Sequence, residues 1–145
     1  MKVSMKGDYG VRALVELAHR YGDGQQMQSA AIASAQSIPE PYLDQLLTTL
    51  RRAGFIRSVR GPQGGHSLIR DPHELRLSEV IAALEGSLAP IACLDDPEGC
   101  RKTASCSLRP VWQEIEAATM RVLDSITIAD LAERERAGSS ARYAI

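Results

Sequence analysis

Apolar residues in the N-terminal half recur at the three- and four-residue spacing of amphipathic helices. They predict a first helix from Asp8 to about Tyr21 and a short second helix that begins at Ser29, whose hydroxyl can cap it. Pro41 suits the first turn of a third helix over residues 42–53, in which four leucines share one face. Three such helices in succession predict a mostly α-helical domain.

Two short runs that alternate apolar and polar residues follow, residues 55–59 and 66–70. The glycine-rich turn between them, 61–65, can adopt positive φ angles and approach a surface closely. A fourth helix is predicted over residues 78–85. Helix, short helix, helix and a two-stranded wing are the order of a winged helix-turn-helix. We therefore predict such a domain, α+β and mostly α, over residues 1–90.

The third helix is the one that such a module inserts into the DNA major groove. Its exposed positions can hydrogen-bond to bases or phosphates. They are Glu40, Tyr42, Asp44, Gln45, Thr48, Thr49 and Arg52. Arg60 and the wing turn would lie at the DNA backbone or in the minor groove. The alternative is that this α+β domain binds a protein.

The longest periodic segment runs from Pro110 to about Ile126 and carries a continuous apolar stripe. A helix this amphipathic, attached beyond a complete small domain, predicts a partner surface. A second copy of the chain suits a two-fold reader of DNA, and an ordinary core helix is the alternative. We expect residues 108–134 to hold a dimerisation helix and a segment that folds back at Ile128, and residues 135–145 to form a flexible tail.

Charge is unevenly distributed, although the 145 residues carry a net charge of only −1. Residues 51–70 hold five arginines and no acid, whereas residues 93–135 hold nine acids and five bases. A local basic segment on a near-neutral chain suits a small DNA-binding domain, and a solvated arginine-rich surface is the alternative. The sequence shows neither a signal peptide nor an apolar run long enough to span a membrane, so we expect a cytoplasmic protein.

The cysteines are gathered in one place: Cys93, Cys100 and Cys106 lie within fourteen residues in the pattern C-x6-C-x5-C, and the chain has no others. The segment that holds them, 91–107, is polar and interrupted by proline and glycine, so it is predicted to be a loop. Clustered thiols in a reducing compartment favour metal ligation over disulfides. A four-coordinate metal needs one further ligand from elsewhere in the chain.

Several of these segments resemble one family. The opening MKVSMKGDYGVRALVELA, the stretch PEPYLDQLLTTLRRAGFIRSVRGPQGG and the cysteine loop with the helix after it are similar to the IscR/NsrR group of bacterial regulators. That group belongs to the Rrf-two superfamily of winged-helix transcription factors. The resemblance runs from Met1 to about Leu131. It implies a homodimer, not an enzyme, in which an iron–sulfur cluster (2Fe-2S or 4Fe-4S) controls promoter binding in response to redox state, nitric oxide or cluster supply.

The resemblance also implies roles for individual residues. Cys93, Cys100 and Cys106 would hold the cluster. Arg109 stands where IscR-like proteins carry a histidine ligand, and arginine cannot ligate because it stays protonated. Some NsrR-like proteins use an acid near the start of the first helix, so Asp8 is the expected fourth ligand, with a simple helix cap as its alternative role. The implied DNA contacts are Tyr42, Gln45, Arg51, Arg60, Pro62, Gln63 and Gly64.

Other uses of the cysteines stay open. A structural zinc would need the same thiolates, although zinc ligands usually lie closer in sequence than these. A thiol enzyme or thiol redox switch would need a thiol with a lowered pKa, and no histidine lies near any cysteine. The histidines have ordinary explanations: a helix end for His19, a strand facing solvent or DNA for His66, and a turn for His73.

Overall fold

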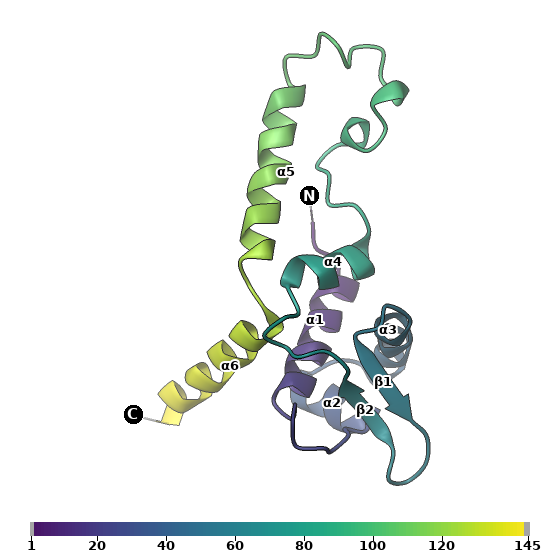
Figure 1. Cartoon of the computed structure of the whole chain (residues 1–145), viewed down its shortest axis with the longest axis vertical. Coiled ribbons are helices and arrows are strands. Elements are labelled where there is room, and N and C mark those ends of the chain that lie inside the picture. The colour runs from purple at the N-terminus through teal and green to yellow at the C-terminus, as the bar shows by residue number, and fades with distance from the viewer. Residues whose placement is uncertain (1, 144–145) are drawn as a thin grey trace.

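Helices and a two-stranded antiparallel sheet form the computed structural model, which describes the backbone of residues 2–143 and the side chains of residues 2–139. The elements are α1 (Met5–Ala18), α2 (Ser29–Gln36), α3 (Glu40–Arg52), β1 (Ile56–Val59), β2 (Gly65–Leu68), α4 (Leu77–Glu85), the 3-10 turns η1 (Ala92–Leu94) and η2 (Pro97–Gly99), α5 (Arg109–Asp124) and α6 (Ile128–Tyr143). From α1 to α5 the order of α-helices and strands is the predicted one, whereas α6 was not predicted as a helix. Figure 1 shows α1 to α4 and the sheet as one packed body, from which α5 and the loop before it project.

The first helix begins three residues before its predicted start because a distant side chain holds its first turn. Ser4 is the N-cap residue. Glu85, at the end of α4, accepts hydrogen bonds from the Ser4 nitrogen (2.9 Å), the Ser4 hydroxyl (2.6 Å) and the Gly7 nitrogen (3.1 Å). A Cβ atom at Gly7 would collide with the Glu85 side chain, so the glycine keeps α1 and α4 close. This contact joins residues 81 positions apart, and local periodicity cannot report it.

The hydrophobic core is formed by α1 to α4, the sheet and the first turns of α6. Its largest fully buried side chains are Leu14, Ile32, Leu43, Leu46, Leu50, Ile56, Leu75, Val80 and Ile128. Burying one such side chain stabilises the fold by roughly 1.5–3 kcal/mol. The four leucines of α3 are all buried, as predicted, so the opposite face of α3 is held toward solvent.

The chain returns to this core at Ile128, where the sequence predicts that it folds back. Thr127 and Asp130 cap α6 reciprocally, because the Thr127 nitrogen donates to the Asp130 carboxylate (2.9 Å) and the Asp130 nitrogen donates to the Thr127 hydroxyl (3.1 Å). Hydrogen bonding of the Thr127 backbone and side chain to the carboxylate lowers the pKa of Asp130. The start of α6 is therefore fixed both by burial and by its cap.

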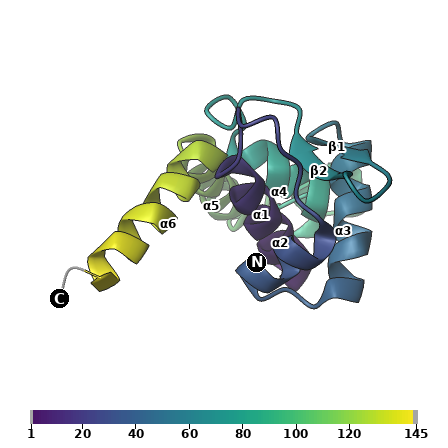
Figure 2. The ribbon, with the colours of Figure 1, turned by 90° about the horizontal axis from the view of Figure 1, so that it is seen from below.

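The last residues differ from the prediction. α6 continues as a helix to Tyr143, whereas the sequence predicts a flexible tail over residues 135–145; residues 144 and 145 lie outside the described residues. Residues 133–137 (ERERA) are strong helix formers, and a helix anchored at its first turn extends at little cost. Figure 2 shows α6 leaving the packed body as an arm.

A long stretch of the chain has no place in the core. None of the residues from 86 to 127 is buried, although they include the cysteine loop and all of α5. The predicted apolar stripe of α5 is exposed, with Val111, Ile115 and Val122 at 47%, 36% and 58%. α5 is therefore not the core helix that the alternative interpretation required. Neither α5 nor any other helix among residues 2–143 is long and apolar enough to cross a membrane.

Candidate nucleic-acid interface and cysteine loop

Arginines on α3 and on the wing are not neutralised by the rest of the described chain. Arg51 and Arg52 end α3, Arg60 follows β1, and all three are exposed. None of them makes an ion pair with a described side chain, unlike Arg12 and Arg70. Unpaired guanidinium groups on one recognition unit attract a phosphate backbone.

The start of α3 presents an aromatic and an amide to solvent. Tyr42 is 37% exposed and stands edge-on to Tyr9 of α1, with 5.7 Å between the ring centroids. The Arg12 guanidinium lies over the Tyr9 ring at 5.6 Å. Gln45 is exposed one turn further along α3. The ring contact limits the motion of Tyr42, so its hydroxyl can meet a partner at little entropic cost.

The tip of the wing is tied to the start of α2. The Gln28 side-chain nitrogen donates to the carbonyls of Gly64 (2.9 Å) and Pro62 (3.4 Å). Arg60, Pro62 and Gln63 are exposed at the tip, whereas Gly64 is buried beneath it. Of the predicted DNA-contact residues, Gly64 alone is buried, and it shapes the turn that presents the others.

His66 links β2 to α2. The sequence predicts instead that His66 faces solvent or DNA. Its Nδ1 lies 2.7 Å from the Ser58 hydroxyl and its Nε2 lies 2.9 Å from the Ser29 hydroxyl. Its backbone also pairs with Met27 through two hydrogen bonds of 2.9 and 2.8 Å. The sequence gives no signal for this contact, because Ser29 and His66 are 37 positions apart.

Protonation of His66 is expected to loosen the wing. Burial lowers the pKa of His66 below its ordinary 6.5; Asp44 opposes this effect and Arg51 adds to it. A histidine with a lowered folded-state pKa contributes stability above pH 6.5, and that contribution is lost as the pH falls through the folded-state pKa. The unfolding temperature should therefore fall between about pH 8 and about pH 5, and it should fall less in His66→Gln. The same loss in both proteins would contradict this role, and the exposed His73→Gln is the matched control.

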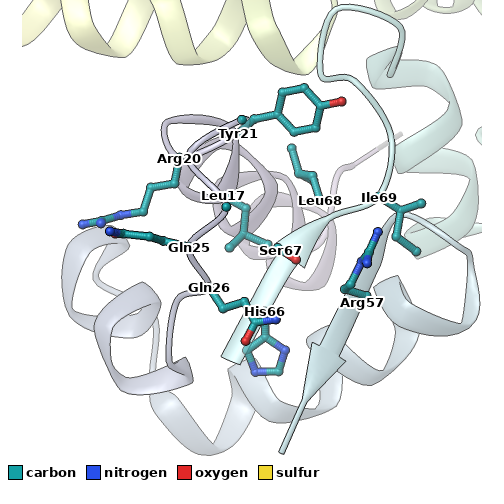
Figure 3. A pocket seen from close by; sticks show the side chains of 12 residues that line it. Leu17, Arg20, Tyr21, Gln25, Gln26, Arg57, His66, Ser67, Leu68 and Ile69 are labelled. Atoms are coloured by element: carbon teal, nitrogen blue, oxygen red, sulfur yellow. The ribbon is translucent and has the colours of Figure 1, made fainter. Parts of the chain in front are cut away.

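A hollow of about 460 Å³ lies beside His66, between the end of α1, the loop after it and β2 (Figure 3). Its lining combines the apolar Leu17 and Leu68 with Arg20, Arg57 and His66. The hollow gives solvent access to one side of the wing–α2 contact, so protons can reach the half-buried imidazole.

The cysteine loop presents three free thiols, each half-buried. Cys93 lies in η1, Cys100 follows η2, and Cys106 lies three residues before α5. The Arg109 guanidinium donates to the Cys93 carbonyl (3.0 Å), so the residue at the expected histidine position ties the first cysteine to α5. The Thr103 hydroxyl contacts the Cys100 carbonyl at 3.0 Å. The loop is thus connected to α5.

This donor set fits an iron–sulfur group by its chemistry. Three thiols on one loop, with no disulfide, are the ligands that such groups take. Among the described side chains, only Glu16, His19 and Glu135 gather ligand atoms within 4.8 Å of one another, so the three thiols lie further apart than this. Because no residue of the loop is buried, it can contract without disturbing the core.

Asp8 lies inside the first turn of α1 and is not its cap. The Ser4 side chain is the cap, so the alternative role of Asp8 as a helix cap is wrong. The Asp8 carboxylate is half-exposed and pairs with Arg12 one turn later at 2.8 Å. Within one chain it does not join the thiols in a ligand group. A ligand role would therefore require contact between subunits and release of Arg12.

Comparison with known proteins identifies the family. Residues 3–134 match the family described as "Rrf2: Iron-dependent Transcriptional regulator". The chain is 38% identical over 132 residues to the HTH-type transcriptional regulator CymR of Bacillus subtilis, covering 91% of this chain and 90% of CymR. The structure titled "The Structure of CymR (YrzC) the Global Cysteine Regulator of B. subtilis" matches with a TM-score of 0.76 at 35% identity, over 92% of this chain and 98% of that one.

A solved structure of T. potens IscR matches with a TM-score of 0.74 at 38% identity, over 93% of this chain and 88% of that one. These relatives confirm the predicted fold class, a mostly α-helical winged helix-turn-helix protein with a long C-terminal helix. They also confirm the resemblance to the IscR group and the expectation that the chain is not an enzyme. The chain belongs to the Rrf2 family of DNA-binding transcriptional regulators.

Proposed function

We propose that this regulator binds promoter DNA in the cytoplasm as a homodimer, and that an iron–sulfur cluster on the cysteine loop controls the binding. The cluster, 2Fe-2S or 4Fe-4S, would be held by Cys93, Cys100 and Cys106, with Asp8 supplied across the dimer. The observation that carries the proposal is the set of three free thiols on an unburied loop between the DNA-binding body and α5. The family description as iron-dependent supports it.

The homodimer is proposed from α5. Leu108, just before α5, and Val111, Ile115 and Val122 within it are between 36% and 58% exposed, and no described part of the chain covers them. An apolar surface of this kind is costly in water and marks an interaction site. A second α5 offers the same self-complementary stripe, and two-fold symmetry would place two α3 helices for adjacent major grooves.

A structural change in the cysteine loop is proposed to move α5. When bound, the cluster would supply a centre that reacts with oxidants or nitric oxide. The chain's own part is mechanical: Arg109 links the backbone of Cys93 to the first turn of α5. A loop that contracts or relaxes would shift α5 against its mate and change the spacing of the two α3 helices. DNA affinity would change by the free-energy difference between the two arrangements.

On each subunit, α3 would enter the major groove, and the wing would lie on the backbone or in the minor groove. The exposure of this face and its unpaired arginines support the assignment. The proposed contacts are made by Tyr42, Gln45, Arg51, Arg52, Arg60, Pro62, Gln63 and the backbone of Gly64.

Arg60→Ala is expected to weaken binding to every duplex and to flatten its salt dependence, because it removes one unpaired cation from the wing. The slope of log affinity against log salt should fall by about 0.9 for each lost phosphate contact. Arg70→Ala is the matched control, since the Arg70 charge is already engaged by Glu79 at 2.7 Å. Fluorescence anisotropy over a salt series measures the affinity and its salt slope for both variants. An unchanged slope in Arg60→Ala would show that the wing does not contact DNA.

The proposed function is tested by comparing DNA binding with and without reconstitution. The protein first selects its own operator from a random DNA pool, and anisotropy then gives the affinity of anaerobic protein before and after iron and sulfide treatment. We expect the two affinities to differ by about fivefold or more. Identical affinities would rule out control by the cluster while leaving DNA binding intact.

The second candidate is a thiol switch or a structural zinc at the same cysteines. A solved structure titled "Crystal structure of Staphylococcus aureus CymR oxidized form", 32% identical over 92% of this chain, favours a redox switch. The half-buried free thiols are accessible to oxidants, as such a switch requires. Colour and iron content separate the candidates, because a zinc or thiol protein is colourless and free of iron.

A further inference from the structure

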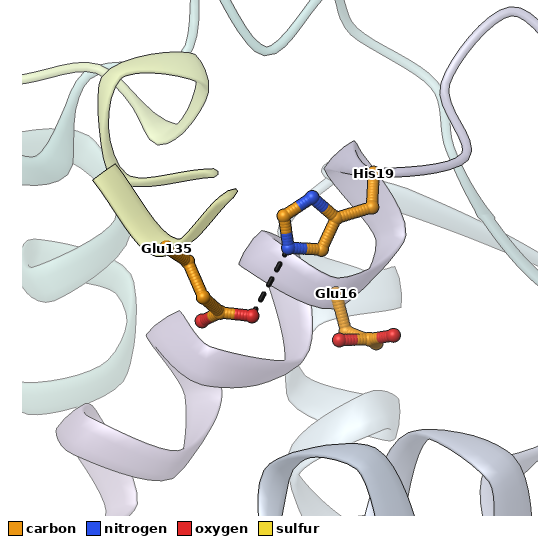
Figure 4. Close-up of side chains that lie close together, drawn as sticks. All are labelled: Glu16, His19 and Glu135. Carbon is orange, nitrogen blue, oxygen red and sulfur yellow. Dashed lines mark hydrogen bonds and ion pairs between the residues drawn. The ribbon is translucent and has the colours of Figure 1, made fainter. Parts of the chain in front are cut away.

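Glu16, His19 and Glu135 bring three metal-ligating side chains together where α6 packs on α1 (Figure 4). One ligand atom of each lies within 4.8 Å of the other two, and the His19 Nε2 is 3.0 Å from a Glu135 carboxylate oxygen. Glu16 lies in the last turn of α1, and His19, three positions on, is its C-cap residue with helical backbone angles, so their side chains share one face. They border a hollow of about 550 Å³ that is open to solvent, so an ion with its waters can enter.

The two carboxylates share their hollow with Arg20 and Arg136 but are not paired with either arginine. Gln36, which is 9% exposed, donates its side-chain nitrogen to both, at 2.8 Å to Glu16 and 3.0 Å to Glu135. No lysine or arginine among the described side chains forms an ion pair with either carboxylate. Two carboxylates in one site repel each other, and a cation between them relieves this repulsion. A divalent ion supplies two positive charges, which match the two carboxylates.

We propose that Glu16, His19 and Glu135 form a binding site for a first-row divalent cation such as Mn²⁺, Fe²⁺ or Zn²⁺. Imidazole suits iron and zinc, and carboxylates suit manganese, so the mixed set accepts this class. A Glu-x-x-His pair on one helix, joined by a glutamate from another helix, is a ligand arrangement found in carboxylate-bound metal centres of helical proteins. Mg²⁺ and Ca²⁺ prefer oxygen ligands alone and should bind more weakly.

Arg136 sets the tautomer of His19 in the metal-free protein. Its guanidinium donates to the His19 Nδ1 at 3.1 Å, so the ring proton lies on Nε2 and faces Glu135. A cation at Nε2 takes the place of that proton, and the neutral ring must then carry its proton on Nδ1. Two donors would then face each other, so Arg136 has to move away. Arg136 therefore opposes metal binding, and its removal should strengthen it.

Occupation of this site fastens α6 to α1. α1 runs through the DNA-binding body, and α6 follows directly after α5, so the ion would stiffen the joint between the body and α5. A ligand that binds only the folded chain also raises its unfolding temperature. The site contains no cysteine, so it is independent of the proposed iron–sulfur cluster.

Manganese is the first probe, because thiolates hold it poorly and the free aqueous ion gives an EPR signal that is lost on binding. We expect the full chain to bind about one Mn²⁺ per protomer, and Glu135→Gln to weaken binding by about tenfold or more. Glu133→Gln is the matched control, because it removes the same charge from an exposed position of the same helix. Equal weakening by the two variants would mean general attraction to an acidic surface and would overturn the site.

Arg136→Gln gives a second and opposite readout that misfolding cannot imitate. It should tighten Mn²⁺ binding several-fold, whereas Arg134→Gln, at an exposed position nearby, should not. Zn²⁺ added to a chain in which all three cysteines are serine should compete with Mn²⁺ and raise the unfolding temperature. A wild-type chain that leaves the EPR signal of millimolar Mn²⁺ unchanged would overturn the proposal.

Discussion

Replacing Cys106 with serine is expected to leave a protein that binds DNA with one affinity, whether or not iron and sulfide are supplied. Cys106 carries a free, half-buried thiol close to α5, on a loop with no buried residue. Its replacement therefore removes a proposed ligand without disturbing the core. In the wild type, reconstitution is expected to change the affinity by about fivefold or more. The comparison is made by anaerobic anisotropy on the selected operator.

Ser107→Ala is the matched control, because it changes an exposed neighbour in the same loop. It should keep the response of the wild type. Circular dichroism should give the same helix content for all three proteins, since the change lies outside the packed body. A Cys106→Ser protein that still responds to iron and sulfide would place the switch elsewhere in the chain.

Gly64→Ala is expected to reduce DNA affinity on the order of tenfold or more while the protein stays folded. A Cβ atom at position 64 would overlap the backbone carbonyl of Val59, and no side-chain rotation relieves a contact with backbone. The turn must therefore open, which breaks the hydrogen bond from Gln28 to the Gly64 carbonyl and displaces Arg60. Because the turn lies at the tip of the wing, the leucine core under α3 is not affected.

Gly138→Ala is the control for this substitution. A Cβ atom there meets nothing within 4 Å, and alanine is favoured over glycine inside a helix by about 1 kcal/mol. Gly138→Ala should keep full DNA affinity and be at least as stable as the wild type. Equal affinities for Gly64→Ala and wild type, measured by anisotropy, would show that the wing does not contribute to binding.

Much of the fold could be predicted from patterns among neighbouring residues. The leucine period of α3, the glycine-rich wing turn and the stripe of α5 each depend on neighbouring residues, so periodicity and turn chemistry report them. The start of α1 was misplaced because it depends on Glu85, which meets Ser4 across 81 positions. The helical course of 135–143 was missed because composition alone suggested a tail, whereas the helix depends on its anchoring turn at Ile128.

The candidate sites divide in the same way. The cysteines and the basic segment are visible as clusters in the sequence, so both were predicted from it. The contact of His66 with Ser29 and the group of Glu16, His19 and Glu135 were not predicted. His19 and Glu135 are 116 positions apart and meet only because α6 returns to α1. Such contacts need the packing of distant elements, which residue spacing does not contain.

The central claim, an iron–sulfur cluster on the cysteine loop, is tested most directly by visible absorption and Mössbauer spectra of the anaerobically isolated protein, for wild type and Asp8→Ala. We expect a brown wild type with the Mössbauer signature of an iron–sulfur cluster, and a changed spectrum or a less stable cluster in Asp8→Ala. An unchanged brown variant would remove only Asp8 from the ligand set. A colourless wild type that iron and sulfide fail to reconstitute would contradict the claim.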